Sequence, residues 1–406
     1  MLELAHKDVL VLGLGISGRS AAAFCAERGA RVVACDERPR DALEDLAPLA
    51  GRVDLVCGRA FPDPAGFDVV VPSPGIPRPR YADRARCVWG DIELAGRALA
   101  VPIIAVTGTN GKSTTCRLIE AMLRAAGLRA EAAGNIGTPS LALVGRPLDA
   151  AVLEVSSFQL EAIDRFRPRV SVILNLAPDH LDRHGSFERY VDTKARLLAN
   201  QQPHDDAVLN AADPVVWALA ARTRARVSAF HDRAAVERGC WLDTGAIAVR
   251  DAENTLRIPL DGLALRGRHN RENALAATAA VAALGVDAGK AAQAFIGFRG
   301  LPHRFELVCR IGDVDYVDDS KATNVSAALR SLESCESRVV WIAGGRDKDL
   351  DFTPLARAAA TRVRAAILIG ESAPRLARAL ADRVPSTQVA SIEAAVAEAA
   401  NAARPG

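Results

Sequence analysis

The segment from Thr107 to Thr114 has the residue types and the order that bind a polyphosphate. It follows the apolar run Ile103–Val106, and in chain order it consists of Thr107, Gly108, Thr109, Asn110, Gly111, Lys112, Ser113 and Thr114. A buried strand that turns through glycines into a helix directs unpaired backbone N–H groups at an anion. Lys112 would contact the β- and γ-phosphates, and the Ser113 hydroxyl would ligate Mg²⁺. The segment therefore predicts binding of ATP and magnesium.

This loop is a variant of the general phosphate-loop pattern. Val106 stands where G-x-x-x-x-G-K-[ST] has its first glycine, so a generic GTPase or kinase loop is the poorer match. A glycine-rich turn with a chance lysine is the alternative, but the strand before the loop and the predicted helix from about Ser113 to Ala126 disfavour it.

Three further chemical groups follow predicted strands or helices of the same region. Glu154 ends the apolar run Ala151–Leu153, and His180 lies just past the predicted strand Val170–Asn175. Ligands of α/β sheets bind at such strand ends, and a carboxylate is a natural ligand of Mg²⁺. Lys194 lies in a predicted helix. Taken one by one, the three could also be a solvated glutamate, a loop histidine and an exposed lysine.

The N-terminal region carries a second glycine turn. The strand Val9–Leu12 leads into Gly13, Gly15 and Gly18 with the spacing G-x-G-x-x-G, and Asp36 ends the following strand. This geometry holds a diphosphate at a helix N-terminus, and on its own it would suggest NAD or FAD. An NAD-dependent dehydrogenase is therefore one competing interpretation.

The segment Thr107–Thr114, with the groups that follow it, resembles the Mur ligases, which build the peptide stem of bacterial peptidoglycan and share a superfamily with folylpolyglutamate synthetase. The resemblance implies that Lys112, Glu154, His180 and Lys194 form the catalytic site. It implies two Mg²⁺ ions, with Ser113, Glu154, His180 and Lys194 around them, and a carbamylated Lys194. Carbamylation needs a neutral amine, hence a site that lowers the lysine pKa.

The same resemblance assigns residues nearer the C-terminus. It implies that Asn270 and Asn273 contact adenine, although Asn270 could instead cap a helix whose first turn holds Asn273. Arg304 and Asp319 would complete the ATP site. The positions expected to face the incoming amino acid are Lys321, Thr323 and Lys348.

Within the family, the chain is most similar to the members that add D-glutamate to UDP-N-acetylmuramoyl-L-alanine. The resemblance covers the first glycine turn, Pro72–Pro77 and Gly90–Leu94, and we find no D-N-P-R signature of the members that add a diamino acid. The residues it implies for the UDP-linked substrate are Gly15, Ile16, Ser17, Asp36, Ser73, Gly75 and Asn135.

The elements that must position these groups are typical of an α/β fold. Short Val/Ile/Leu-rich runs alternate with Ala-rich helical segments, which predicts parallel sheets covered by helices. We expect three domains: a Rossmann-like substrate domain at 1–93, a phosphate-loop ATPase-type domain at 94–298, and a Rossmann-like amino-acid-binding domain at 299–406. The length of 406 residues suits this number.

Composition excludes other classes. The 51 basic and 49 acidic residues give a net charge of +2, so no global field favours nucleic acid or an anionic membrane. The eight cysteines lack metal-site or disulfide-framework spacing, and no apolar run reaches the roughly 20 residues of a membrane span. We expect a cytoplasmic protein that acts as a monomer.

The end of the chain differs from the family pattern. Members usually continue beyond the equivalents of Ala403–Gly406 with a strand and a helix that carry serine and phenylalanine contacts to the glutamate. If those contacts are absent, we expect nearly complete loss of ligase activity.

The expected reaction is transfer of a phosphoryl group from ATP to the terminal carboxylate of the UDP-linked substrate, followed by attack of the D-glutamate amine on the acyl phosphate. The alternatives are another Mur-type or folylpolyglutamate-type ligase, the dehydrogenase, and a non-catalytic UDP-sugar binding protein.

Overall fold

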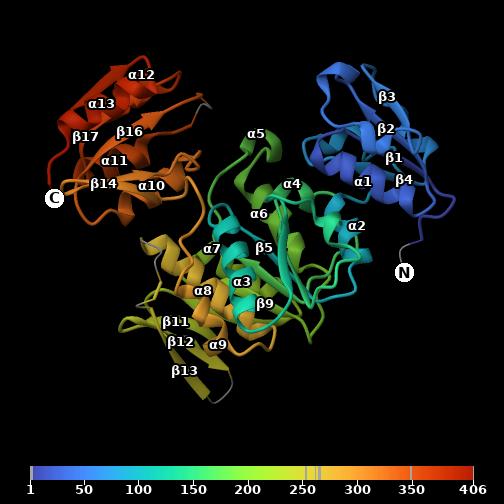
Figure 1. Ribbon diagram of the computed structural model, residues 1–406, viewed down its shortest axis with the longest axis horizontal. Helices are drawn as coiled ribbons and strands as arrows, with labels where there is room; N and C mark the ends of the chain where they lie inside the picture. Colours follow the sequence, from blue (N-terminus) through green and yellow to red (C-terminus); the bar gives the residue numbers. More distant parts are fainter. Residues whose placement is uncertain (1–2, 252–253, 261, 264–266, 348–349, 406) are drawn as a thin grey trace. The chain divides into compact units, whose positions relative to one another are not determined.

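The computed structural model describes residues 3–251, 254–260, 262–263, 267–347 and 350–405 (Figure 1). The chain forms two compact units. Unit 1 comprises Met1–Leu263 and Glu272–Phe298, and unit 2 comprises Ala264–Arg271 and Arg299–Gly406. Parallel sheets with flanking helices occur in both, so the predicted α/β class is confirmed. The division of unit 1 into domains at residue 93 stays a prediction.

The N-terminal part of unit 1 is a parallel sheet of the order β3-β2-β1-β4. The predicted strand Val9–Leu12 is β1, and Asp36 is the last residue of β2, as expected. Helix α1 follows the first glycine turn, and its apolar side packs on the sheet. The bounds are β1 Asp8–Leu12, α1 Ile16–Glu27, β2 Arg31–Asp36, β3 Asp54–Cys57 and β4 Val69–Pro72.

The central sheet of unit 1 has the order β13-β12-β11-β10-β9-β8-β5-β7-β6 in the described residues. Strands β5 to β11 run parallel to one another, each paired with its neighbours in this order, whereas β12 and β13 add an antiparallel edge that the sequence did not predict. The bounds are β5 Ile103–Thr107, β6 Ala130–Gly134, β7 Ala150–Glu154, β8 Val170–Ile173, β9 Asp206–Asn210, β10 Arg226–His231, β11 Gly239–Asp243, β12 Ala246–Asp251 and β13 Asn254–Pro259.

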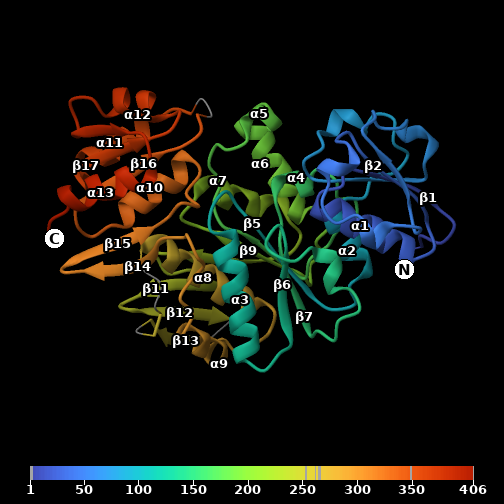
Figure 2. The ribbon, with the colours of Figure 1, turned by 45° about the horizontal axis from the view of Figure 1, so that its top comes forward.

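Helices cover both faces of this sheet. Alternate side chains of β5 and β7 enter two separate cores, because successive residues of a strand point to opposite faces. One core receives α3 and α8, and Figure 2 shows α3 lying over one face. The bounds are α2 Asp91–Ala98, α3 Lys112–Ala125, α4 Ser157–Leu160, α5 Leu181–His184, α6 Phe187–Ala195, α7 Pro214–Trp217, α8 Arg268–Ala283 and α9 Ala288–Ala291.

One expectation from the sequence about these elements needs correction. The strand expected at Val170–Asn175 ends at Ile173, because Leu174 and Asn175 turn toward the phosphate loop. The Ala-rich segment from Glu272 to Phe295 is not one continuous helix, because α8 ends at Ala283, Gly285 has φ +86° and a second short helix begins at Ala288. Glycine tolerates this left-handed conformation at no steric cost.

Unit 2 holds a three-stranded parallel sheet, β16-β17-β18, and an antiparallel pair, β14 and β15, within the described ranges. The apolar run Val339–Ala343 lies in β16. Helices α11 and α12 supply most of its apolar core. The bounds are β14 Glu306–Ile311, β15 Val314–Asp318, α10 Val325–Ser334, β16 Val339–Gly344, α11 Thr353–Arg362, β17 Val363–Ile369, α12 Ala373–Leu380, β18 Ser386–Val389 and α13 Ile392–Ala402.

The central sheet brings the predicted catalytic groups to one edge. Strands β7, β5 and β8 are neighbours and run in the same direction, so their carboxyl ends lie side by side. The phosphate loop follows β5, Glu154 ends β7, and the loop that carries His180 follows β8. Across the described part of the chain, none of the helices is long and apolar enough to cross a bilayer.

Candidate active site

The phosphate loop is held open by its glycines and by Asn175. Gly108 and Gly111 have φ of +152° and +86°, which side chains larger than glycine rarely adopt. The Asn175 side chain accepts from the Asn110 N–H at 2.9 Å and donates to the Asn110 carbonyl at 3.0 Å. The Thr109 N–H donates to the Asn175 carbonyl. The loop therefore keeps its shape through contacts to the β8 strand end.

Lys112 lies over this loop at the start of α3. Its Nζ donates to the carbonyl oxygens of Gly108 and Thr109, each at 2.9 Å. The next two residues, Ser113 and Thr114, are buried in the first turn of the helix. A cation and a helix N-terminus thus face the same point, which is the arrangement that binds phosphate oxygens.

Glu154 is a buried carboxylate whose two oxygens differ in their hydrogen bonding. Its residue is 2% exposed, so the solvated strand-end interpretation is wrong. Oε1 accepts from the Asn135 Nδ2 at 2.8 Å, whereas Oε2 is buried and has no hydrogen-bond partner among the described residues. A buried carboxylate oxygen without a donor is costly unless a cation or ligand meets it. Glu154 therefore fits the role of a Mg²⁺ ligand, and Asn135 orients it.

Lys194 is also buried, at 2% exposure, so the exposed-lysine interpretation is wrong. Its Nζ donates to Thr107 Oγ1 at 3.2 Å and to the Gly108 carbonyl at 3.0 Å. Burial, and then the nearby charge of Lys112, hold the pKa of Lys194 well below its usual range. Both effects favour the neutral form of the amine, which is the form that reacts with CO₂.

His180 precedes α5 in the loop after β8. Its backbone adopts the left-handed conformation with φ +52°, and its side chain is 48% exposed. The ring contacts Phe158, with centroids 4.9 Å apart, and Nε2 lies 3.8 Å from Asp179 Oδ2. His180 is thus the most accessible of the four predicted catalytic side chains, and its role stays a prediction.

The first glycine turn is closed by side chains expected to bind the UDP-linked substrate. The Leu14 N–H donates to Asp36 Oδ2 at 2.8 Å, and Ser73 Oγ donates to the Gly13 carbonyl at 2.8 Å. Hydrogen bonding from Arg38 lowers the pKa of Asp36 to about 2. At Gly18, a Cβ atom would lie 1.8 Å from the Gly13 carbonyl oxygen, so only glycine fits there.

Of the remaining residues predicted for this substrate, Asn135 lies directly after β6 and contacts Glu154, away from this turn. Gly15 precedes α1 as its N-cap, Ile16 is the first residue of the helix and 64% exposed, and Ser17 follows it. Gly75 lies in the turn after β4, two residues beyond Ser73.

A small cavity lies between the segment that follows β4 and helix α4, and we name it the α4 cavity. Asp91 lies at its wall, fully buried, and accepts from the Gln159 Nε2 at 2.9 Å. Burial raises the pKa of Asp91. Neither Asp91 nor Gln159 was among the site residues expected from the sequence. The lining residues are Pro72, Ser73, Pro74, Ile76, Tyr81, Gly90, Asp91, Phe158, Gln159 and Ala162.

The two asparagines predicted near adenine are both buried. Helix α8 begins at Arg268, so Asn270 lies inside the helix and the interpretation as a helix cap is wrong. Asn273 Oδ1 accepts from Thr115 Oγ1 at 3.3 Å, and a side chain at Gly111 would meet it. The structure therefore brings Asn273 to the phosphate loop of unit 1.

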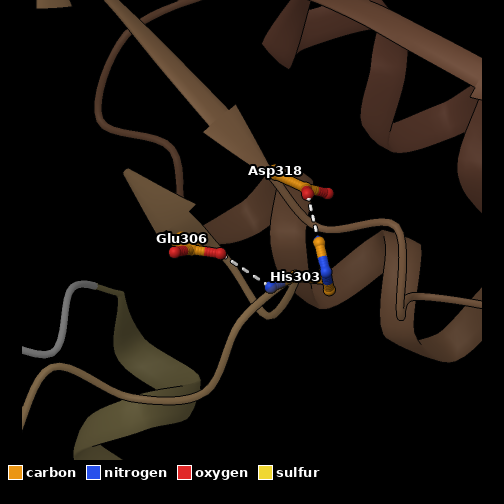
Figure 3. A group of neighbouring side chains, drawn as sticks. All are labelled: His303, Glu306 and Asp318. Carbon is orange, nitrogen blue, oxygen red and sulfur yellow. Dashed lines mark hydrogen bonds and ion pairs between the residues drawn. The ribbon is translucent and has the colours of Figure 1, made fainter. Parts of the chain in front are cut away.

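In unit 2, Arg304 and Asp319 lie near a group of hydrogen-bonded side chains. His303 Nδ1 lies 2.6 Å from Asp318 Oδ2, and the His303 N–H donates to Glu306 Oε2 at 2.8 Å (Figure 3). These bonds fix the turn that precedes Arg304. We name this group the His303 turn.

Asp319 is held by the same part of unit 2. Its carboxylate accepts from the Phe305 N–H at 3.0 Å and from the Ser331 hydroxyl. The Lys321 N–H donates to the His303 carbonyl, and the Thr323 N–H donates to the Lys321 carbonyl. The third residue predicted to face the amino acid, Lys348, lies outside the described residues.

Several site residues were not found from the sequence. Tyr190 Oη is 3.0 Å from Thr109 Oγ1, and its ring lies under the Lys194 Nζ at 5.0 Å. Asn175 was detectable as the polar end of an apolar strand. Tyr190 gave no signal, because its place depends on how α6 packs against the loop.

Family models match the whole succession of these features. A Mur ligase MurD-like N-terminal domain matches residues 7–83, a Mur ligase middle domain matches 106–281, and a Mur ligase glutamate ligase domain matches 303–406. The chain belongs to the Mur ligase family. The predicted resemblance is thereby confirmed, and the dehydrogenase and the non-catalytic binding protein are not favoured.

Curated relatives of this Mur ligase are named UDP-N-acetylmuramoylalanine–D-glutamate ligase. The one from Geobacter metallireducens is 43% identical over 415 aligned residues, which cover 100% of the chain and 92% of the relative. The one from Pelotomaculum thermopropionicum is 42% identical, over 93% of the chain and 85% of the relative.

Solved structures share the fold of this Mur ligase at lower identity. MurF ligase from Thermotoga maritima in complex with ADP is 18% identical, with a TM-score of 0.64 over 100% of the chain and 90% of that structure. A pseudomurein peptide ligase type C from Methanothermus fervidus is 20% identical, with a TM-score of 0.61 over 95% of the chain and 89% of that structure. Both support the predicted three-domain Mur ligase architecture.

Proposed function

We propose that this Mur ligase joins D-glutamate to UDP-N-acetylmuramoyl-L-alanine with hydrolysis of ATP, in the synthesis of peptidoglycan precursors. The observation that carries the proposal is identity of 40–43% over the whole chain to relatives named for that reaction. The folylpolyglutamate-type alternative is not favoured, because the N-terminal match is to the MurD-like domain.

The reaction must bring together two anions, the substrate carboxylate and the γ-phosphate. The N–H groups at the start of α3 and the ammonium of Lys112 bind the phosphates and offset the charge that develops during transfer. The resulting acyl phosphate is attacked by the amine of D-glutamate. The carbonyl re-forms with loss of phosphate, so no enzyme nucleophile is needed.

The residues at the carboxyl ends of β7, β5 and β8 have the chemistry to ligate magnesium. The unpartnered Glu154 Oε2 supplies a hard oxygen ligand, and the Ser113 hydroxyl and His180 would complete the protein's ligand set. When bound, Mg²⁺ supplies neutralisation of phosphate charge. Asn135 keeps the Glu154 carboxylate in place through its bond to Oε1.

We further propose that Lys194 is carbamylated in the active protein. The low pKa that burial produces supports this, since CO₂ adds to a neutral amine. The carbamate would carry a negative charge where Lys194 Nζ now donates to two oxygens of the phosphate loop. That charge would help organise Mg²⁺ at the γ-phosphate.

The other predicted binding residues keep their proposed roles. The turn around Gly15, Asp36 and Ser73 would bind the UDP-linked substrate, supported by its closed, glycine-dependent geometry. Arg304 and Asp319 would complete the ATP site, and Lys321 and Thr323 would bind D-glutamate.

ATP and UDP-linked sugars are cytoplasmic metabolites, so we propose that the protein acts in the cytoplasm. That it acts as a monomer stays a prediction.

Phosphate release tests this function. We expect release from ATP to require UDP-N-acetylmuramoyl-L-alanine and to increase with D-glutamate but not with lysine, L-alanine or buffer alone. The assay compares the rates of phosphate release with different amino acids, so it identifies the amino-acid substrate even if the absolute rate is low. Release that depends on lysine or L-alanine, or that needs no amino acid, would contradict the proposal.

A further inference from the structure

His180 has an unfavourable backbone conformation and precedes a helix of a single turn. Its φ of +52° lies in the left-handed region, which a residue other than glycine keeps only where its surroundings fix it. The His180 carbonyl accepts from the N–H groups of Arg183 and His184, each at 3.0 Å, within α5. A single helical turn is unstable by itself. Contacts from outside α5 are therefore needed to fix His180.

The side chain of Arg183 makes the first of these contacts. It is 13% exposed, and its Nε and Nη2 donate to Glu161 Oε1 at 3.2 Å and to Oε2 at 2.6 Å. Two such bonds between a guanidinium and a carboxylate fix direction as well as distance. Glu161 directly follows α4 and is itself 11% exposed. Arg183 thus joins α5 to the end of α4.

The same guanidinium has a second anchor in the segment that follows β4. Its Nη2 also donates to the Ile76 carbonyl at 2.9 Å. The Ile76 N–H donates to the Ser73 carbonyl, and Ser73 Oγ donates to the Gly13 carbonyl of the first glycine turn. Arg183 therefore links the loop that carries His180 to the turn proposed to bind the UDP-linked substrate.

The ring of Phe158 connects Arg183 to the imidazole of His180. Arg183 Cζ lies 5.0 Å from the centroid of the Phe158 ring, within the range of a cation–π contact. The Phe158 and His180 centroids are 4.9 Å apart, with the ring planes at 59°. Phe158 and Ile76 both line the α4 cavity. Arg183 thus supports His180 through the backbone of α5 and through a packed ring.

We propose that Arg183 is a positioning residue that holds His180 in place to ligate Mg²⁺ at the catalytic edge of the central sheet. Arg183 acts through His180 and not on a reacting atom. A lysine could not replace it, because one ammonium group lacks the planar set of donors that bonds both Glu161 oxygens and the Ile76 carbonyl. The inference rests on the proposed function, since it takes His180 to be a metal ligand.

The affinity for Mn²⁺, a probe of Mg²⁺ sites, tests this role without turnover. Mn²⁺ is titrated into the protein loaded with a non-hydrolysable ATP analogue and followed by electron paramagnetic resonance, with the analogue alone as background. We expect Arg183→Lys to weaken Mn²⁺ binding about tenfold, as for other partners that orient a metal ligand. Arg189→Lys, at an exposed arginine of α6, is the matched control and should leave the affinity unchanged.

A double-mutant cycle tests whether the effect passes through His180. In the His180→Ala background, Arg183→Lys should weaken Mn²⁺ binding no further, because the side chain that it positions is already absent. An additive loss would overturn the inference, and so would an Arg183→Lys variant with the Mn²⁺ affinity of the unmodified protein.

A second variant carries the test if Arg183→Lys lowers the melting temperature. Glu161→Gln keeps the shape of the first anchor but removes its charge, and we expect it to weaken Mn²⁺ binding about threefold, as part of a charge-assisted hydrogen bond is lost. An unchanged affinity in this folded variant would equally overturn the inference.

The outcome distinguishes the two proposals. If the unmodified protein makes no glutamate-containing product, the ligase function itself fails. If it makes the product and binds Mn²⁺ no more tightly than the Arg183→Lys variant does, only the positioning role fails.

Discussion

At the scale of the residue, two charged groups of the candidate site are shielded from water. Glu154 and Lys194 are each 2% exposed, although carboxylates and ammonium groups are almost never fully buried without a partner. Burial makes both chemically useful, because it leaves a carboxylate oxygen without a donor and lowers the pKa of the lysine. The sequence motif identified both residues, but their burial could not be predicted from it.

The buried lysine gives the first prediction at this scale. Lys194→Ala should lower kcat on the order of 100-fold, because a group that organises the metal site is lost. A short carboxylic acid added to the assay should restore part of the activity if a carbamate normally supplies the anion. Lys290→Ala, at an exposed lysine of α9, is the matched control. Full activity of Lys194→Ala in a phosphate-release assay would reject the carbamate proposal.

The contact between His184 Nε2 and Ser157 Oγ, at 3.1 Å, could not be predicted from the sequence. Ser157 and His184 are 27 residues apart, and a histidine at the end of a short helix has no signal of its own. Their contact depends on how α4 and α5 pack beside the central sheet. Glu154, by contrast, was predictable because an apolar run ends in a single carboxylate.

At the scale of the element, strand direction explains why the site lies where it does. The carboxyl ends of β7, β5 and β8 share one edge, so each strand brings one of the predicted catalytic groups or the phosphate loop to that edge. Parallel strands and their order of appearance were predictable from apolar runs and glycines. The antiparallel edge of β12 and β13 was not, because its hairpin pattern was not separated from the surrounding helical segments.

The opposite edge of the same sheet carries a structural ion cluster. Asp206, the first residue of β9, is fully buried and pairs with three arginines that precede or start neighbouring strands. The partners are Arg169 at 2.5 Å, Arg226 at 2.8 Å and Arg238 at 3.2 Å. One carboxylate thus joins the amino ends of four adjacent strands.

Removal of that carboxylate should destabilise unit 1 without touching the catalytic edge. Asp206→Asn is expected to lower the melting temperature by about 5 °C. This corresponds to about 2 kcal/mol, less than for a fully buried pair because the arginines stay partly exposed. Asp8→Asn, which breaks an exposed pair with Arg31, is the control and should change little. An unchanged melting temperature of Asp206→Asn would show that the cluster contributes nothing to stability.

At the scale of the whole molecule, the family assignment rests on the order of three matched regions, each with its own chemistry. Residues 7–83, 106–281 and 303–406 contain in turn the first glycine turn, the phosphate loop with Glu154, His180 and Lys194, and the part of unit 2 that carries Arg304 and Lys321. A phosphate loop alone would identify only an ATP-binding protein. The succession of all three is what makes an amide-forming ligase the best account.

The most direct test of this account is the identity of the product. The protein is incubated with ATP, Mg²⁺, UDP-N-acetylmuramoyl-L-alanine and either D-glutamate or L-glutamate, and the UDP-linked material is analysed by mass spectrometry. We predict a species heavier by one glutamate residue, formed with D-glutamate only and with one phosphate released per product. Equal product from L-glutamate, or phosphate release without any glutamate-containing product, would contradict the central claim.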